Sequence, residues 1–124
     1  MSRLLLLIVA GLFSLAAAAV DLGNAEPPTQ QQLRDLLSGN TLAGEWDGRR
    51  YTQHFAANRT TRYREGDGAV TQGTWRITAD GLYCSVWPPS PTEACYVVLV
   101  DGDRILWKSG DRIFPSTVIE GDHF

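Results

Sequence analysis

The fold of this chain is decided by a stretch that runs from Gly73-Thr74-Trp75-Arg76-Ile77, through Asp80-Gly81-Leu82-Tyr83-Cys84, to Cys95-Tyr96-Val97-Val98-Leu99. Its short runs of β-branched and aromatic residues are typical of strands. Asp-Gly separates the first run from the second, and a proline-rich turn at residues 88–91 separates the second from the third. Both are typical of tight connections. The stretch therefore predicts three consecutive antiparallel strands.

The same pattern continues on both sides of this stretch, with turn signals such as Asp47-Gly48 and Asp101-Gly102. Between the turns we expect eight strands, at Thr41–Trp46, Arg50–Ala56, Thr60–Glu65, Val70–Thr78, Leu82–Trp87, Ala94–Val100, Arg104–Lys108 and Arg112–Ile119. Closure of such a sheet into a barrel removes two exposed edges. The predicted fold is all-β: an eight-stranded up-and-down antiparallel barrel, or an open meander of the same strands.

One short helix is expected before the strands. Thr29-Gln30-Gln31-Gln32 matches a capping box, in which Thr29 is the N-cap and Gln32 reaches back to it. Leucines at positions 33, 36 and 37 recur at helical spacing, and Gly39 ends the pattern. We expect a helix over Gln30–Ser38 whose leucine side packs on the strands.

The N-terminal residues have the pattern of a secretory signal peptide. Arg3 precedes an apolar run from Leu4 to Leu15, which ends in four alanines at positions 16–19. This order is typical of an exported protein cleaved near Ala19, and the alternative is a membrane anchor of marginal length. The sequence predicts a signal peptide at 1–19, a flexible tether at 20–28 and a single domain at 29–124, located in the periplasm or secreted.

Cys84 and Cys95 are the two cysteines of the chain. An exported chain meets an oxidising compartment, where a small core gains from a cross-link. The two residues flank the proline-rich turn, so neighbouring strands would place them opposite each other. We expect a disulfide worth about 3 kcal/mol in the chain-entropy model. We expect no metal site, because the spacing is not that of a zinc pair and His54 and His123 are the only nitrogen ligands.

The charge of the chain argues against nucleic acid as a partner. Loss of residues 1–19 removes Arg3, so 10 of the 11 basic residues remain against 14 acidic residues, and the net charge moves from −3 to about −4. Nucleic-acid binding requires a clustered positive excess. Arginines nevertheless concentrate between Arg49 and Arg64, and arginine favours planar anionic groups.

Period-2 alternation divides the predicted hairpin at residues 50–65 into two faces. With Phe55 opposite Thr61, the side chains of Tyr51, Phe55 and Tyr63 share the core side. The other side carries Arg50, His54, Arg62 and Arg64. We interpret this second side as a solvated face, with an exposed histidine, and as the candidate patch for an anionic partner.

The same alternation assigns an interior to the other strands. The expected interior residues are Trp75, Ile77, Leu82, Cys84, Val86, Cys95, Val97, Leu99, Ile105 and Trp107. An eight-stranded barrel is either filled by side chains or holds one small ligand. Trp46, Trp75 and Trp107 are the candidate aromatic lining of such a cavity. A filled core is the favoured interpretation, and Trp87, beside the proline-rich turn, is expected at the surface.

The sequence contains no convincing catalytic constellation. Ser85, His54 and an aspartate could be combined into a triad, but no strained nucleophile motif surrounds any serine. Paired acids such as Glu65 with Asp67 sit in predicted turns, where aspartate serves the backbone. We therefore expect a protein without enzymatic activity and without a cofactor.

Two resemblances extend this interpretation. Gly44-Glu45-Trp46, on the first strand after a short helix, is similar to the Gly-x-Trp opening of lipocalins and other calycin barrels. Leu37–Thr41, Tyr51–Phe55, Gly73–Arg76 and the hairpin between the cysteines resemble a family of small secreted bacterial proteins that is classed as a domain of unknown function. The resemblances imply a calycin-like barrel in an exported bacterial protein, and they imply no activity.

The expected function is that of a non-catalytic binding module for a small apolar ligand. The alternative is an inhibitor or interaction protein for an exported hydrolase, because the size, the single disulfide and the loose N-terminal segment resemble those of bacterial metalloprotease inhibitors. A ligand carrier predicts an apolar cavity. An inhibitor predicts a filled barrel that acts through a loop or through residues 21–32. In both cases we expect a monomer that is free of the membrane after signal cleavage.

Overall fold

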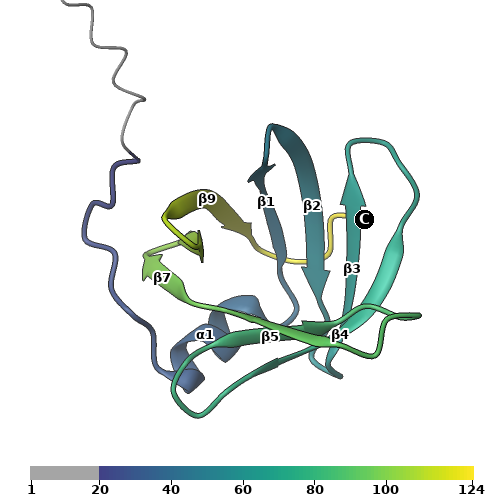
Figure 1. Cartoon of the computed structure of the whole chain (residues 1–124), viewed down its shortest axis with the longest axis horizontal. Coiled ribbons are helices and arrows are strands. Elements are labelled where there is room, and N and C mark those ends of the chain that lie inside the picture. The colour runs from purple at the N-terminus through teal and green to yellow at the C-terminus, as the bar shows by residue number, and fades with distance from the viewer. Residues whose placement is uncertain (1–19) are drawn as a thin grey trace, which may run out of the picture.

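The computed structural model describes residues 20–124, which form one helix and nine strands (Figure 1). These are α1 (Gln30–Leu37), β1 (Thr41–Trp46), β2 (Arg49–Phe55), β3 (Thr60–Glu65), β4 (Thr71–Ile77), β5 (Tyr83–Val86), β6 (Glu93–Tyr96), β7 (Val98–Asp101), β8 (Arg104–Ser109) and β9 (Arg112–Ile119). The predicted all-β fold with one N-terminal helix is confirmed. The predicted signal peptide lies outside the described residues. No helix within residues 20–124 has the length and apolar character needed to cross a membrane.

The nine strands belong to one antiparallel sheet, in the order β6-β5-β4-β3-β2-β1-β9-β8-β7. The two ends of this sheet, β6 and β7, are consecutive in the chain and separated by Val97 alone. The backbone N–H of Lys108 on β8 donates to the carbonyl oxygen of Val97 at 3.0 Å. One continuous segment of the chain, bent at Val97, thus supplies both edge strands of the sheet. The sheet forms a nearly closed barrel.

This bend accounts for the ninth strand. The sequence predicts one strand over Ala94–Val100, whereas the structure divides it into β6, which pairs with β5, and β7, which pairs with β8. The two partner strands lie at opposite ends of the sheet, so the chain must change direction between them, and the exposed Val97 marks the break. The prediction of eight strands was wrong at this point, while the other seven agree with the structure to within one residue at each end.

The turn between β1 and β2 is formed by Asp47 and Gly48, one of the Asp-Gly pairs that predict tight turns. Asp47 and Gly48 both have positive φ, at 51° and 77°. Positive φ at both central residues is the requirement of the tight hairpin turn that matches the twist of the flanking strands, and Asp-Gly is among the pairs that meet it most easily.

Helix α1 covers one end of the barrel (Figure 1). The capping box is confirmed: the backbone N–H of Gln32 donates to Thr29 Oγ1 at 3.1 Å, and that of Thr29 donates to Gln32 Oε1 at 2.9 Å. Leu33 and Leu37 are buried in the core. Gln30 Nε2 donates to the carbonyl oxygen of Ile77 at 3.0 Å, which ties the start of the helix to the end of β4.

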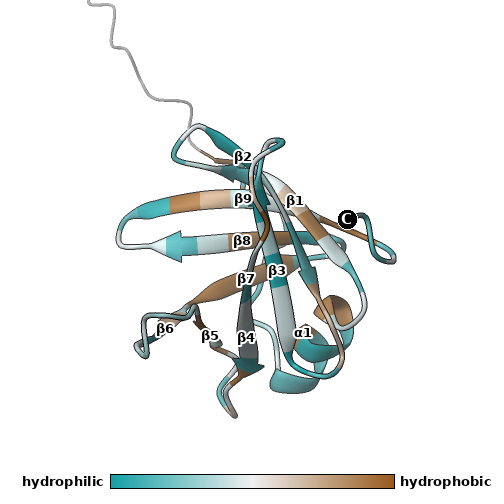
Figure 2. Cartoon of the chain, turned by 90° about the vertical axis from the view of Figure 1, so that its right-hand side faces the viewer, coloured by the Kyte–Doolittle hydropathy of each residue, from teal (hydrophilic) through white to brown (hydrophobic). Residues whose placement is uncertain are grey.

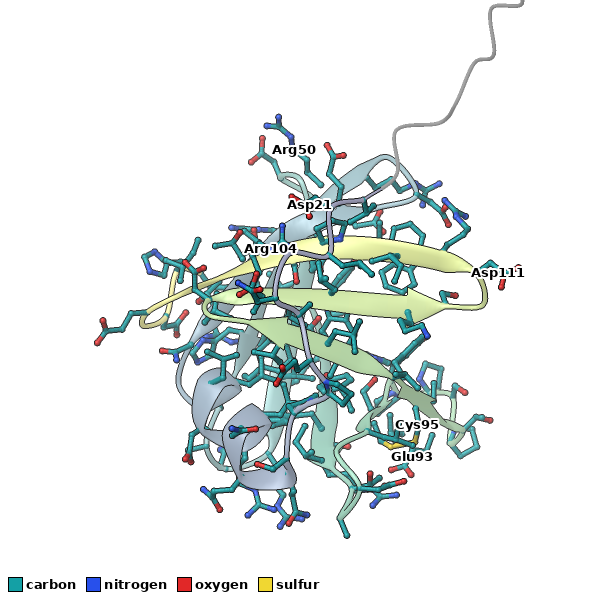
Figure 3. All side chains as sticks on the ribbon, turned by 90° about the vertical axis from the view of Figure 1, so that its left-hand side faces the viewer. Asp21, Arg50, Glu93, Cys95, Arg104 and Asp111 are labelled. Carbon is teal, nitrogen blue, oxygen red and sulfur yellow. A yellow bond between two sulfur atoms is a disulfide. The ribbon has the colours of Figure 1, made fainter. Side chains whose placement is uncertain are left out.

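Residues 20–28 lie along the barrel (Figure 3). The backbones of Glu26 and Val100 exchange two hydrogen bonds, of 3.0 and 2.8 Å, and Arg104 Nη2 donates to the carbonyl oxygen of Asp21 at 2.8 Å. The sequence predicts a flexible tether here because the segment has little to bury. The structure gives this segment a point of attachment, because the free edge of β7 offers unpaired backbone groups, and the backbone of Glu26 pairs with Val100 there whatever its side chain.

The barrel interior confirms part of the predicted pattern. Phe55 lies opposite Thr61 in the register of β2 and β3, and the side chains of Tyr51 and Phe55 are buried. Trp75, Ile77, Ile105 and Trp107 are also buried in the core. Figure 2 shows the contrast along the sheet, with apolar residues along β7 and more polar residues along β3.

The faces of β5, β6 and β7 are the reverse of the prediction. Ser85 and Tyr83 lie opposite the inward-facing Trp75 and Ile77. Tyr96 and Val98 then continue the interior, while Leu82, Cys84, Val86, Cys95, Val97 and Leu99 fall on the alternate positions. The error arose because Leu82-Tyr83-Cys84-Ser85-Val86 carries apolar residues on both faces, so alternation does not choose between them.

Candidate functional site

A cavity of about 420 Å³ lies inside the barrel, towards the end opposite α1. Its lining comprises Trp46, Tyr51, Gln53, Tyr63, Thr71, Tyr83, Ser85, Trp87, Pro88, Ala94, Tyr96 and Trp107. Tyr83 lies deepest, and its ring packs on Phe55 and Trp75 with centroid distances of 5.8 and 6.5 Å. The volume falls within the range of about 300–1,000 Å³ that is typical of small-molecule sites. The favoured expectation of a filled interior was therefore wrong for this half of the barrel.

One wall of the cavity is a continuous chain of aromatic contacts. The ring of Trp46 stacks on Phe114 with centroids 4.2 Å apart, and it meets Tyr96 edge-on at 5.9 Å. Tyr96 meets Trp107 at 6.3 Å, and Trp107 meets Tyr83 at 4.9 Å, both edge to face. Such geometries are favourable between aromatic quadrupoles. Each ring is held by its neighbours, so the wall is preformed.

The facing wall depends on the absence of a side chain at Gly44. Here Tyr51 stacks on Tyr63 with centroids 5.4 Å apart. A Cβ at Gly44 would lie 3.1 Å from Tyr51 Oη and 2.9 Å from Ser116 Cβ. The Gly44-x-Trp46 motif therefore has a physical explanation in this chain: the glycine leaves room for Ser116 and for the hydroxyl of Tyr51, and the tryptophan forms part of the cavity wall.

A small polar cluster interrupts the aromatic lining. Gln53 Nε2 donates to Thr61 Oγ1 at 2.9 Å and to Tyr83 Oη at 3.2 Å. Trp87 Nε1 donates to Ser85 Oγ at 3.1 Å. These bonds satisfy part of the polar lining, and they reduce the number of positions that a ligand can recognise through hydrogen bonds.

The lining is electrically neutral. It contains no acidic or basic side chain, and its ionisable residues are all tyrosines. Burial raises the pKa of Tyr51 to about 12. Burial, together with the nearby charge of Glu65, raises the pKa of Tyr63 to about 12, and burial raises that of Tyr83 further. These hydroxyls stay protonated at neutral pH, so the cavity suits an uncharged, largely apolar ligand.

Two of the three candidate tryptophans line the cavity. Trp46 and Trp107 do so, whereas Trp75 lies deeper in the core, where its Nε1 donates to the carbonyl oxygen of Ala56 at 3.0 Å. Trp87 was expected at the surface but is half-buried and lines the cavity, with its ring edge-on to Tyr63 at 6.0 Å. The missed signal was the alternation Tyr83, Ser85, Trp87, which places Trp87, one residue beyond the end of β5, on the inward face.

The arginines of the candidate patch already have partners within the chain. Arg62 pairs with Asp122, and the guanidinium groups of Arg62 and Arg64 lie over the ring of Phe124, with Cζ 4.8 and 5.2 Å from its centroid. The exposed Arg50 stands apart from them, 3.7 Å from Glu45. The C-terminal tail at residues 121–124 therefore covers much of the patch, and recruitment of an anionic partner there stays a prediction.

His54 is buried, with only 7% of its surface exposed, so the expectation of a solvated histidine was wrong. Its side chain points to the outer face, as predicted, but the C-terminal tail covers it. The backbone N–H of His123 donates to Thr41 Oγ1 at 3.1 Å, and Thr41 Oγ1 donates to the carbonyl oxygen of Gly121 at 2.7 Å. Thr41 Oγ1 in turn lies 3.5 Å from His54 Nδ1. Sequence alternation reports the face of a strand, not what later covers it.

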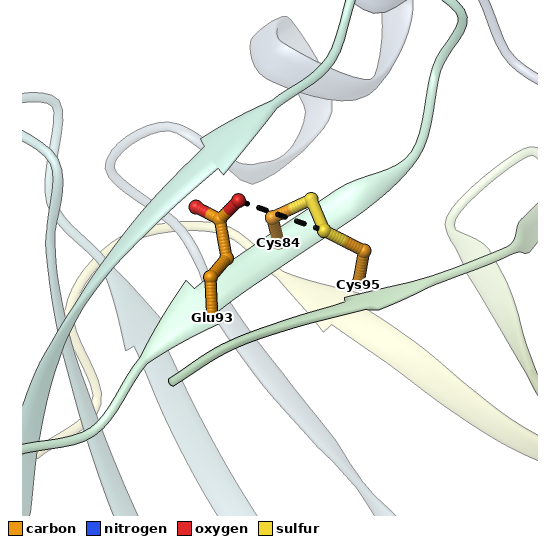
Figure 4. Close-up of side chains that lie close together, drawn as sticks. All are labelled: Cys84, Glu93 and Cys95. Carbon is orange, nitrogen blue, oxygen red and sulfur yellow. Dashed lines mark hydrogen bonds between the residues drawn. A yellow bond between two sulfur atoms is a disulfide. The ribbon is translucent and has the colours of Figure 1, made fainter. Parts of the chain in front are cut away.

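Cys84 and Cys95 form the predicted disulfide, with Cα atoms 4.0 Å apart on directly opposed positions of β5 and β6. Glu93 lies beside the bridge, with Oε1 3.8 Å from Cys95 Sγ (Figure 4). These three residues are close enough to resemble a metal site. Both sulfur atoms are engaged in the disulfide, so neither is a thiolate that could ligate a metal.

Ser85 and His54, two members of the conceivable catalytic triad, lie on opposite faces of the barrel wall. Ser85 faces the interior from β5, opposite Trp75, and His54 faces the outer side of β2 beneath the tail. The barrel wall separates the two side chains, so His54 is not placed to act as a base for Ser85.

No protein-family model, curated protein or solved structure matches this chain. The resemblances to calycin barrels and to small secreted bacterial proteins remain predictions. The geometry of the cavity is consequently the basis for the functional interpretation.

Proposed function

We propose that this protein is an exported, non-catalytic binding module that holds a small apolar ligand inside its barrel. The observation that carries the proposal is the cavity of about 420 Å³, in which seven of the twelve lining residues are aromatic and none is acidic or basic. Apolar cavities with a few convergent polar groups are typical of small-molecule sites. Preformed walls reduce the entropy cost of binding, because few side chains need to be ordered.

Location in the periplasm or outside the cell is part of this proposal. The disulfide between Cys84 and Cys95 is compatible with an oxidising, extracellular compartment, and the N-terminal pattern predicts a secretory signal. The inhibitor alternative receives less support, because it predicts a filled barrel and a loose N-terminal segment. Within residues 20–28, Glu26 instead pairs with Val100 of β7, and Asp21 accepts a hydrogen bond from Arg104 of β8.

Titration with N-phenyl-1-naphthylamine, a neutral apolar dye, tests the proposal. The dye should bind saturably with one site per chain and with increased fluorescence. Ala94→Trp should weaken this binding severalfold, because Ala94 lies at the exposed rim of the cavity, where an indole would narrow the entrance. Thr74→Trp is the matched control, since Thr74 is exposed on the outer face of β4. Normal binding by Ala94→Trp, or none by the wild type, would contradict the proposal.

A further inference from the structure

Gln53 supplies the one amide side chain of the cavity lining. It lies on β2, is 93% buried with 7% of its surface exposed, and belongs to the cavity lining. Both hydrogens of its amide nitrogen are engaged, one with Thr61 Oγ1 and the other with Tyr83 Oη.

The hydrogen bonds around Thr61 decide the orientation of this amide. The Thr61 hydroxyl donates its single hydrogen to the carbonyl oxygen of His54 at 2.9 Å. Towards Gln53 it can therefore only accept, so the atom that faces it must be the amide nitrogen and not the oxygen. The neighbours of Gln53 thus fix Nε2 in place and leave Oε1 on the other side of the amide.

Gln53 Oε1 accepts no hydrogen bond from the residues that the structure describes. Among the described residues, the fully enclosed side-chain nitrogen and oxygen atoms without a hydrogen-bond partner are Arg64 Nε and Arg104 Nε. Gln53 Oε1 is not one of them, so this unpaired oxygen is not fully enclosed by protein. Because Gln53 is otherwise buried and lines the cavity, this access is from the cavity side. A hydrogen-bond donor on the ligand would stabilise the complex by pairing with this carbonyl oxygen. A ligand without a donor would displace water from the oxygen and leave it unpaired, which lowers the affinity.

The surroundings of Oε1 define the rest of the ligand. The aromatic walls, formed by Tyr51 and Tyr63 on one side and by Trp46, Tyr96 and Trp107 on the other, offer faces and edges to a flat ring. No cation lines the cavity to stabilise a carboxylate, and transfer of an unpaired anion into such surroundings is strongly unfavourable.

We infer that the ligand is a neutral, flat aromatic molecule that donates a hydrogen bond, from a hydroxyl or a ring N–H, to Gln53 Oε1. This inference rests on the proposed function and names the chemical class of its ligand. It assigns Gln53 as the residue that selects among apolar molecules of similar size.

Calorimetric titration of three naphthalenes tests the inference with probes of one shape. 2-Naphthol carries the donor, 2-methylnaphthalene replaces it by a methyl group, and 2-naphthoate carries a negative charge. Gln53→Met removes the acceptor and keeps the approximate volume. The ratio of the affinities for naphthol and methylnaphthalene should fall about ten-fold in Gln53→Met, the effect of one neutral hydrogen bond. It should not change in Thr52→Val, an alteration on the outer face of the same strand.

Gln53→Met also removes the bonds to Thr61 and Tyr83, so its melting temperature is measured alongside. A crystal structure of the wild-type complex with 2-naphthol provides a readout that does not depend on the variant. The ligand oxygen should lie within about 3.2 Å of Gln53 Oε1. An unchanged affinity ratio, or a naphthol oxygen directed elsewhere, overturns the inference and leaves the proposed function standing. Binding of 2-naphthoate more tightly than naphthol also overturns it, and binding of no naphthalene overturns both.

Discussion

Gly73 on β4 lies directly against the indole of Trp87, so closely that a Cβ at position 73 would lie 2.8 Å from Trp87 Cε3. It would also collide with the backbone carbonyl oxygen of Val86. The missing side chain is therefore what allows Trp87 to turn over the sheet and line the cavity.

Gly73→Ala should destabilise the fold by about 1–3 kcal/mol, the usual cost of overpacking. Alanine by itself favours a strand over glycine, so a loss of stability would have to come from the collision. The variant should also bind the naphthylamine dye more weakly, because Trp87 moves. Urea unfolding and dye titration measure both effects, with Thr74→Ala as the neighbouring outward-facing control. Stability equal to the wild type would show that the strand backbone at Val86 and the indole of Trp87 both adjust to the added Cβ without cost.

Trp75→Ala should lower the free energy of unfolding by about 3–5 kcal/mol, as expected for loss of a buried ring. Trp75 is 5% exposed, and its ring packs edge-on against Phe55 at 5.6 Å. Trp75→Phe keeps a ring but loses the hydrogen bond to Ala56 and should cost less. Chemical denaturation of the three proteins gives the order. An Ala variant as stable as the Phe variant would argue against a packed environment.

Replacement of both Cys84 and Cys95 by serine should lower the melting temperature by roughly ten to twenty degrees. The basis is a cross-link worth about 3 kcal/mol for a loop of this length, with a shift of several degrees per kcal/mol in a domain of about one hundred residues. Dithiothreitol should lower the melting temperature of the wild type and leave that of the double variant unchanged. Detection of two free thiols in exported protein by mass spectrometry would contradict the disulfide.

Stability should fall in acid partly through Glu93. Hydrogen bonds from Arg76, at 2.8 and 2.6 Å, hold the pKa of Glu93 below its ordinary value. Because folding lowers this pKa, the ionised carboxylate stabilises the folded state at every pH above the unfolded pKa of about 4.3. This stabilisation is lost as the pH falls through the pKa of the folded state. Glu93→Gln should therefore show a flatter decline below about pH 4 in urea unfolding at several pH values. Parallel curves for both proteins would show that the ion pair is uncoupled from folding.

Replacement of Arg62 and Arg64 by alanine should loosen the C-terminal tail with little effect on the barrel. Exposed ion pairs are worth at most about 1 kcal/mol, so the melting temperature should change by only a few degrees. The backbone N–H groups of Gly121 and His123 donate to Asn40 Oδ1 and Thr41 Oγ1. Their hydrogen exchange should accelerate, whereas in Arg49→Ala it should not. Unchanged exchange in the double variant would show that these two bonds hold the tail alone.

Most of the fold was predictable because its signals are local. Strand β3 and the capping box at Thr29 follow from β-branched runs, helical spacing and turn residues that act within a few positions. The alternation of β2 also placed Tyr51 and Phe55 correctly, since only one of its faces is apolar. Strand β5, with apolar residues on both faces, gave no such contrast, and its face was assigned wrongly.

The sequence by itself determined the helix, seven of the nine strands, their order and the pairing of the two cysteines, because turn chemistry, periodicity and loop length are properties of neighbouring residues. Only the tertiary structure decided that the interior holds a cavity, that Trp87 reaches into it past Gly73, and that the tail covers His54. A cavity is the volume that side chains from distant strands leave unfilled, and burial of an outward-facing residue depends on a segment far along the chain. Neither quantity is carried by any local stretch.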